Sequence, residues 1–150
     1  MELNESIIGL KGNEFVFTVE KRHVRQFAQA LGDTNPLYLD DEYAKDGRHG
    51  GLIAPLTFPI AIGADGEGSI ALELDHRRML HGEQEFVYIR PIRVGDVLHC
   101  QSKVTELYER NGKSGKMQFL SIMTEMNDPS GEKVAESIMN IIYRALPEAK

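Results

Sequence analysis

The sequence predicts an α+β fold, in which an antiparallel sheet wraps around a central apolar helix. Residues 52–63 are apolar almost throughout, as expected for a helix that is buried on all faces. From residue 84 onward, apolar and polar residues alternate in four long stretches, which is the period of β-strands. Short turns separate these stretches, so neighbouring strands should run antiparallel.

The first half of the chain predicts one strand followed by helices. Residues 15–19 alternate as a short strand. Helical spacing then takes over, and Gly32 provides a stop. The apolar positions with this spacing are Val24, Phe27, Ala28 and Leu31. The acidic residues 40–42 suit the first turn of another short helix.

The apolar segment 52–63 contains two prolines, Pro55 and Pro59. Because proline is tolerated only in the first turn of a helix, any helix here should start near Thr57. We expect residues 56–63 to be largely buried beneath the sheet.

The second half predicts strands at 84–91, 97–108, 116–127 and 133–144, divided by turn-forming residues at 94–96, 111–115 and 128–131. In the third of these strands, Leu120, Ile122 and Met126 share one face, and Met117, Phe119 and Met123 share the other. Since both faces are partly apolar, one side should pack on the helix and part of the other on a second subunit.

Length and composition indicate one ordinary domain, residues 1–150. The net charge of −6 argues against a nucleic-acid partner. The single cysteine, Cys100, excludes an internal disulfide and suits a reducing compartment. The N-terminus lacks a signal-peptide pattern, and no apolar run approaches the ~20 residues that span a bilayer. We therefore expect a cytoplasmic protein without a membrane partner.

No metal site or cofactor is expected. His76 and His81 lack the cysteine or carboxylate spacing of a zinc site. The glycines within 47–51 and 63–68 are not followed by the Lys-Ser/Thr pair of a phosphate-binding loop.

The most informative segment for function is residues 32–43, which read Gly-Asp-Thr-Asn-Pro-Leu-Tyr-Leu-Asp-Asp-Glu-Tyr. Pro36 fixes its own φ and moves Asn35 toward an extended conformation, so a shaped loop should follow the helix. Such a loop can hold Asp33 and Tyr38 near one another over a pocket. The dipeptides alone favour a simpler alternative, in which Asp33 and Asn35 only satisfy local backbone groups in a turn.

This segment resembles the Asp-x-Asn-Pro-hydrophobic-His signature of MaoC-like dehydratases and (R)-specific enoyl-thioester hydratases. Residues 51–58, and residues 81–86 running on to 90–98, resemble further stretches of that family in the same order. The pattern is most similar to the N-terminal, or FAS1-like, MaoC dehydratase branch, which also includes non-catalytic subunits of heterodimeric 3-hydroxyacyl dehydratases. The resemblance implies a hotdog fold, dimerisation and a thioester of CoA or acyl carrier protein as ligand.

The family's catalytic histidine would fall at position 38, where this sequence has Tyr38, whereas Asp33, Asn35 and Pro36 match. Histidine titrates near ~6.5 and tyrosine near ~10, so Tyr38 can donate a proton but is a poor base. The candidate catalytic residues are Asp33, Tyr38 and His81, of which His81 is a better substitute base than His49. A structural role for each histidine is the simpler alternative.

The dehydration that the resemblance implies also needs donors for an enolate-like thioester oxygen. Backbone N–H groups at a helix N-terminus can supply them, and the candidates are Leu56 and Thr57, because Pro55 has no N–H. A plain helix start with a threonine cap is equally compatible. Asn35 and Gln84 are further candidates for substrate binding.

Three functions remain open. The favoured one is a hydro-lyase, a dehydratase or hydratase acting on 3-hydroxyacyl or 2-enoyl thioesters. The alternative is a non-catalytic acyl-thioester-binding subunit paired with a histidine-bearing MaoC-like chain, so the dimer can be homodimeric or heterodimeric. These two separate only at Tyr38. The third is a hotdog thioesterase, but the Asp-x-Asn-Pro match argues against this function.

Overall fold

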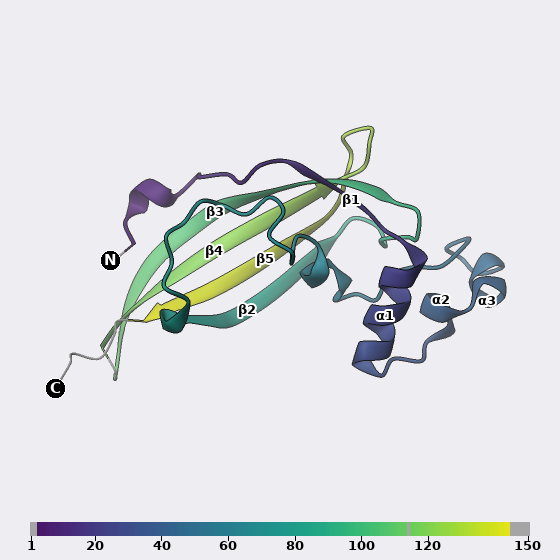
Figure 1. The fold of residues 1–150 in the computed structure, drawn as a ribbon, viewed down its shortest axis with the longest axis horizontal. Helices are drawn as coiled ribbons and strands as arrows, with labels where there is room; N and C mark the ends of the chain where they lie inside the picture. Colours follow the sequence, from purple (N-terminus) through teal and green to yellow (C-terminus); the bar gives the residue numbers. More distant parts are fainter. Residues whose placement is uncertain (1–2, 114, 145–150) are drawn as a thin grey trace.

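The computed structural model describes residues 3–113 and 115–144, which form a five-stranded antiparallel sheet with the helices gathered at one end (Figure 1). The α+β class is therefore confirmed. The strand order is β1-β3-β4-β5-β2, so β1 and β2 are the edge strands. The strands are β1 Phe15–Thr18, β2 Met79–Tyr88, β3 Val97–Gly112, β4 Gly115–Asn127 and β5 Lys133–Arg144. The helices are α1 Lys21–Leu31, α2 Pro36–Leu39 and α3 Asp41–Lys45, with 3-10 turns η1 Glu5–Ile7, η2 Phe58–Ala61 and η3 His76–Arg78.

The predicted helices near the N-terminus are confirmed. In α1, Val24 and Ala28 are fully buried, and Gly32 ends the helix at a φ of 69°, where its N–H bonds to the carbonyls of the last turn. In α3 the acidic first turn is present, and the Asp40 side chain accepts the N–H of Tyr43.

Strand β2 begins at Met79, five positions before the predicted start at residue 84. A bulge between His81 and Glu83 shifts the register with β5 and interrupts the alternation on which the prediction relied. Gly82 occupies this bulge, and a Cβ there would lie 2.8 Å from the Ile142 side chain. A side chain at this position would therefore collide with β5.

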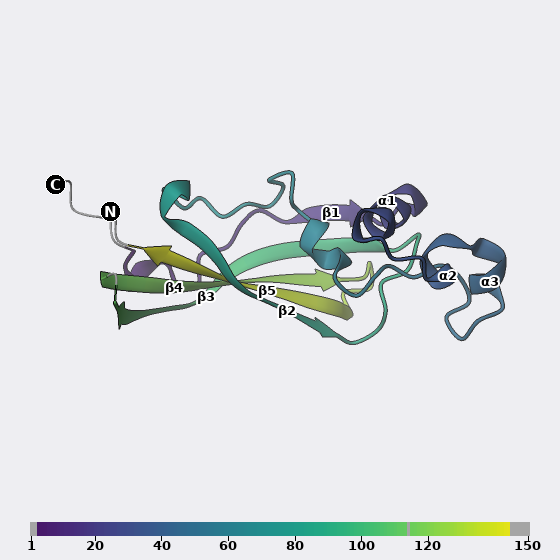
Figure 2. The same cartoon turned by 90° about the horizontal axis from the view of Figure 1, so that it is seen from below.

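The apolar segment 52–63 does not form the expected buried helix, and this is a correction to the sequence analysis. It contains only η2, in which Phe58 and Pro59 are buried, while Leu56 is 64% and Ile60 47% exposed. Positive-φ glycines at Gly63, Gly66 and Gly68 turn the chain away after one 3-10 turn. Residues 63–75 then run as a coil along one face of the sheet (Figure 2).

The covered face of the sheet carries two separate hydrophobic clusters. The helix-side cluster joins the sheet to α1 and η2, and its buried members include Val24, Phe58 and Leu98. The coil-side cluster includes Val104, Leu120 and Ile141, packed against apolar residues of η1 and of the coil. Leu120 and Met126 of β4 are fully buried on this face, as their alternation predicted.

The Cys100 side chain is 2% exposed, and burial raises the pKa of its thiol to about 12. A buried thiol that keeps its proton is a poor nucleophile, so Cys100 has a structural role in the helix-side cluster. Among residues 3–113 and 115–144, no helix has the length and apolar character needed to cross a bilayer.

A matched pair of alanine substitutions tests the packing of the coil. Gly50 and Gly68 both have a φ of +68°, but a Cβ at Gly68 would lie 2.3 Å from the Phe15 ring, whereas nothing lies within 4 Å of one at Gly50. Gly50→Ala should cost roughly 1–2 kcal/mol of left-handed strain. Gly68→Ala should add a further ~1–3 kcal/mol of overpacking. Urea unfolding measures both losses, and equal values would contradict the close packing of Gly68 on Phe15.

Candidate functional site

The loop between α1 and α2 holds two polar side chains by local bonds. Asp33 Oδ1 accepts the N–H of Asn35 at 2.9 Å, and Asn35 Oδ1 accepts the N–H of Leu37 at 3.0 Å, capping α2 just before Pro36. The local turn that the dipeptides favoured is therefore present. Among the bonds of the described residues, Asp33 uses only Oδ1, which leaves Oδ2 for a ligand.

Tyr38 lies on α2, half-buried, and packs against the helix-side cluster. Burial raises the pKa of its phenol, and the nearby charge of Asp33 raises it further, while a hydrogen bond with the Asn35 side chain acts in the opposite direction. Tyr38 thus stays protonated at neutral pH and cannot act as a base. The structure brings Asp33, Asn35 and Tyr38 together, as the sequence suggested, and we call these residues the Asp33 group.

Tyr88, at the end of β2, also belongs to this group, and the sequence analysis missed it. Its hydroxyl donates to the Leu56 carbonyl at 2.7 Å. Burial raises the pKa of Tyr88 well above its usual range, and the proximity of Tyr38 adds to this effect. The available signal was a tyrosine at a half-buried strand position, where the polar tip needs a partner.

Leu56 and Thr57 lie just before η2. Among the hydrogen bonds of the described residues, neither backbone N–H donates, so both are available to an oxygen of a ligand. The Thr57 side chain makes no cap bond, so the threonine-cap alternative is not observed. Because η2 has only four residues, its dipole adds little to these two donors.

The structure does not bring His81 to this group within one chain. His81 pairs with Ile141 beside the coil-side cluster, and it is seven positions from Tyr88 on the same strand. At about 3.3 Å per residue, this separation is roughly 20 Å. His49 lies in the turn after α3 and is half-buried. The substitution of His81 for the missing base therefore finds no geometric support within one chain.

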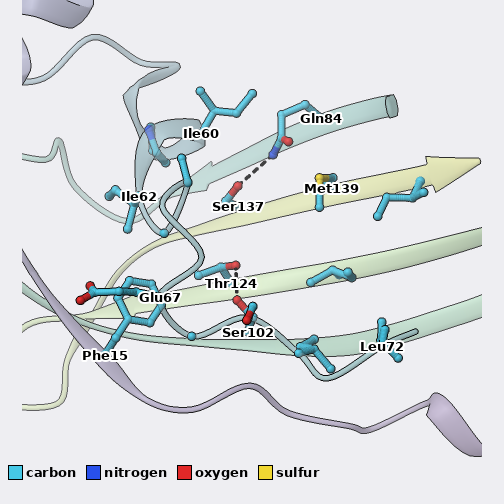
Figure 3. A pocket seen from close by; sticks show the side chains of 18 of the residues that line it. Phe15, Ile60, Ile62, Glu67, Leu72, Gln84, Ser102, Thr124, Ser137 and Met139 are labelled. Atoms are coloured by element: carbon cyan, nitrogen blue, oxygen red, sulfur yellow. Dashed lines mark hydrogen bonds between the residues drawn. The ribbon is translucent and has the colours of Figure 1, made fainter. Parts of the chain in front are cut away.

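A cavity of about 520 Å³ lies between the coil and the covered face of the sheet (Figure 3). Its walls come from η2, the coil and all strands of the sheet, and are mostly apolar. Gln84 projects toward it from β2, and its Nε2 donates to Ser137 Oγ at 2.8 Å and to the Ile138 carbonyl at 3.1 Å. The predicted substrate-binding residue Gln84 thus lines the cavity and does not belong to the Asp33 group.

In the described part of the chain, no cluster of three or more His, Cys, Asp or Glu side chains has the arrangement of a metal site.

The sequence matches a known protein family and has similar relatives among known proteins. The family described as FAS1-like, dehydratase domain region matches residues 6–137. A UPF0336 protein of Thermobifida fusca is 36% identical over 132 residues, covering 85% of this chain and 84% of that protein.

Two solved structures share the fold. The C-terminally truncated HadBC (3R-hydroxyacyl-ACP dehydratase) complex from Mycobacterium tuberculosis has a TM-score of 0.76 and 23% identity, covering 93% of this chain and 99% of that chain. A MaoC-like dehydratase has a TM-score of 0.78 and 26% identity, covering 93% of this chain and 42% of that one. These matches confirm the hotdog fold.

The two tyrosines predict a loss of stability in alkali. The pKa values of Tyr38 and Tyr88 are raised in the folded state, whereas unfolded phenols titrate near ~10. The stabilisation of the folded state by these two phenols is complete below about pH 10. It falls as the pH rises through the folded pKa values, because the unfolded chain loses its protons first. The free energy of unfolding should therefore decrease above about pH 10.

Tyr88→Phe should reduce this alkaline slope, and Tyr43→Phe, which removes a 58% exposed phenol, is the matched control. Urea unfolding at several pH values measures the slopes. The same slope in wild type and Tyr88→Phe would contradict the assigned environment of Tyr88.

Proposed function

The chain belongs to the FAS1-like, dehydratase domain region family of MaoC-like proteins, and on that basis we propose that it acts in the dehydration of 3-hydroxyacyl thioesters or the reverse hydration. Its role in this proposal is that of the subunit that binds the acyl chain of a CoA or acyl-carrier-protein thioester. The general base is then a histidine of a second MaoC-like chain. The observation that carries the proposal is the protonated Tyr38 at the position of the family's histidine.

The chemistry explains why a partner is needed. Removing the proton next to a thioester carbonyl requires a base with a pKa near the working pH, and a later step requires an acid for the leaving hydroxyl. Tyr38 holds its proton, and His81 lies roughly 20 Å away along β2. Asp33 is the one carboxylate that the loop places beside Tyr38, and it also serves the turn. Within a single chain, neither Tyr38 nor His81 therefore supplies the base.

The cavity supports acyl-chain binding. Its volume of about 520 Å³ falls within the usual range of small-ligand pockets. Burial of an alkyl chain stabilises a complex by about 0.8 kcal/mol for each methylene group. The cavity extends from Pro59 and Ile60 of η2 toward Ile141 of β5. A thioester held near Leu56 and Thr57 can thus place its alkyl tail between the coil and the sheet.

An exposed sheet edge supports pairing with a second chain. β2 is an edge strand, and Leu80 and Val87 on it, with Ile89 just beyond, are 45%, 38% and 67% exposed. Long edges with apolar side chains are usually covered in the native assembly. The M. tuberculosis structure of the same fold is described as a HadBC complex. We propose that β2 and its apolar residues face the histidine-bearing partner.

Independent hydro-lyase activity is a second candidate, because Asp33 and a protonated phenol lie side by side. In that case Asp33 Oδ2 would act as base and Tyr38 as proton donor. The two candidates make opposite predictions for the isolated chain.

We expect the purified chain alone to show no hydration of a short 2-enoyl-CoA, and to gain activity when a histidine-bearing MaoC-like chain is added. Tyr38→His should raise the activity of the isolated chain, because a base that titrates near ~6.5 returns to its place. A positioned general base contributes roughly a hundredfold to ten-thousandfold, which a spectrophotometric assay resolves. Tyr38→Phe is the matched control, since it changes the residue without adding a base.

Asp33→Asn separates the two candidates, because it keeps the shape of the turn and removes the charge. Hydration by the isolated wild type that is abolished in Asp33→Asn would overturn the subunit proposal and establish independent catalysis.

A further inference from the structure

A row of hydroxyl side chains crosses the floor of the cavity. It consists of Ser102 on β3, Thr124 on β4 and Ser137 on β5, which are opposite one another in the strand register (Figure 3). We call these three residues the hydroxyl row. The row lies between the helix-side and coil-side clusters, so the covered face changes from apolar to polar and back along each strand.

The polarity of the row stands out against its neighbours on the same face. Two positions away on either side lie Cys100 and Val104 on β3, Ile122 and Met126 on β4, and Ala135 and Met139 on β5. Apolar side chains at all three positions would have joined the two clusters into one core. The hydroxyls instead interrupt the apolar wall at one level of the cavity.

The row retains hydrogen-bonding capacity that the described residues do not use. Ser102 Oγ and Thr124 Oγ1 are 2.8 Å apart, so one of their two protons is spent on the other hydroxyl. Ser137 Oγ accepts from Gln84 Nε2 at 2.8 Å. Among the bonds of the described residues, neither the Ser137 proton nor the second proton of the pair has an acceptor. Two O–H donors are thus available at the cavity floor.

The row lies beyond the reacting atoms of a bound thioester. Phe86 is the β2 partner of Ser137, and Tyr88 lies two positions further toward the Asp33 group. Two residues of extended strand span about 7 Å. The hydroxyl row would therefore contact the acyl chain beyond the thioester carbonyl and the third carbon, where the reaction takes place.

Resting on the proposed function, we propose that the hydroxyl row makes the cavity selective for acyl chains that carry an oxygen substituent, a hydroxyl or a keto group, within the chain. An alkyl chain that covers the row would leave two O–H donors without partners, which weakens the binding of that chain. An oxygen at this level accepts from them instead. Sites that hydrogen-bond a substrate group discriminate strongly against the analogue that lacks it.

The test is equilibrium binding of two acyl-CoA thioesters of equal length to the protein, one with a saturated acyl chain and one with a hydroxyl within its acyl chain. The wild type should bind the hydroxylated thioester roughly tenfold to a hundredfold more tightly. A wild type that binds both equally, or prefers the saturated thioester, overturns the inference and leaves the proposed function standing. Binding of neither thioester overturns the proposed function itself.

Substitutions then assign the preference to the row. Thr124→Val removes one hydroxyl at nearly constant shape, and Ser102→Ala and Ser137→Ala remove the others. Because Ser102 and Thr124 share one free proton, only the double variant Ser102→Ala/Thr124→Val removes that donor, and Ser137→Ala removes the other. The double variant and Ser137→Ala should each reduce the preference, mainly by strengthening binding of the saturated thioester. Thr105→Val is the matched control, because Thr105 lines a separate concavity with Glu83 and Glu106 and bonds to the Ser121 carbonyl. A preference that persists in both the double variant Ser102→Ala/Thr124→Val and Ser137→Ala, or is lost equally in Thr105→Val, overturns the assignment to the row.

Discussion

The early end of the apolar segment is the constraint on which the rest of the structure depends. After one turn of 3-10 helix, Gly63, Gly66 and Gly68 adopt positive φ angles and direct the chain along the sheet as a coil. A full helix there would fill the covered face and merge its two clusters. The coil instead leaves a cavity of about 520 Å³ between itself and the strands. Phe15 packs against the Gly68 backbone and fixes the coil in this course.

Most elements could be predicted because their patterns are long and local. The helix α1 ends at Gly32, and strands β3, β4 and β5 follow the alternation in the sequence. The start of β2 was missed because a bulge at Gly82 breaks the period. The apolar segment was misjudged for a different reason: composition indicates burial, but it does not reveal that three nearby glycines take a left-handed conformation.

Part of the candidate site could likewise be predicted from the sequence, and part could not. Asp33, Asn35 and Tyr38 lie within one short loop, so their proximity follows from the sequence. Tyr88 joins them only through the tertiary fold, since it is 32 positions from Leu56, whose carbonyl it binds. His81 was placed with the site because it is near a strand start, but a strand has two ends and the site is at the other one. The sequence alone does not show which end of β2 lies beside the Asp33 group.

The bulge on β2 has a consequence for how the protein associates. An incoming strand that pairs with the free edge of β2 meets a break in the hydrogen-bond spacing between His81 and Glu83. Such a strand can keep its register on only one side of the break, so strands cannot be added along the whole edge. This geometry opposes the continuous addition of strands along the β2 edge. One glycine thus protects an apolar edge strand from uninterrupted pairing with further strands.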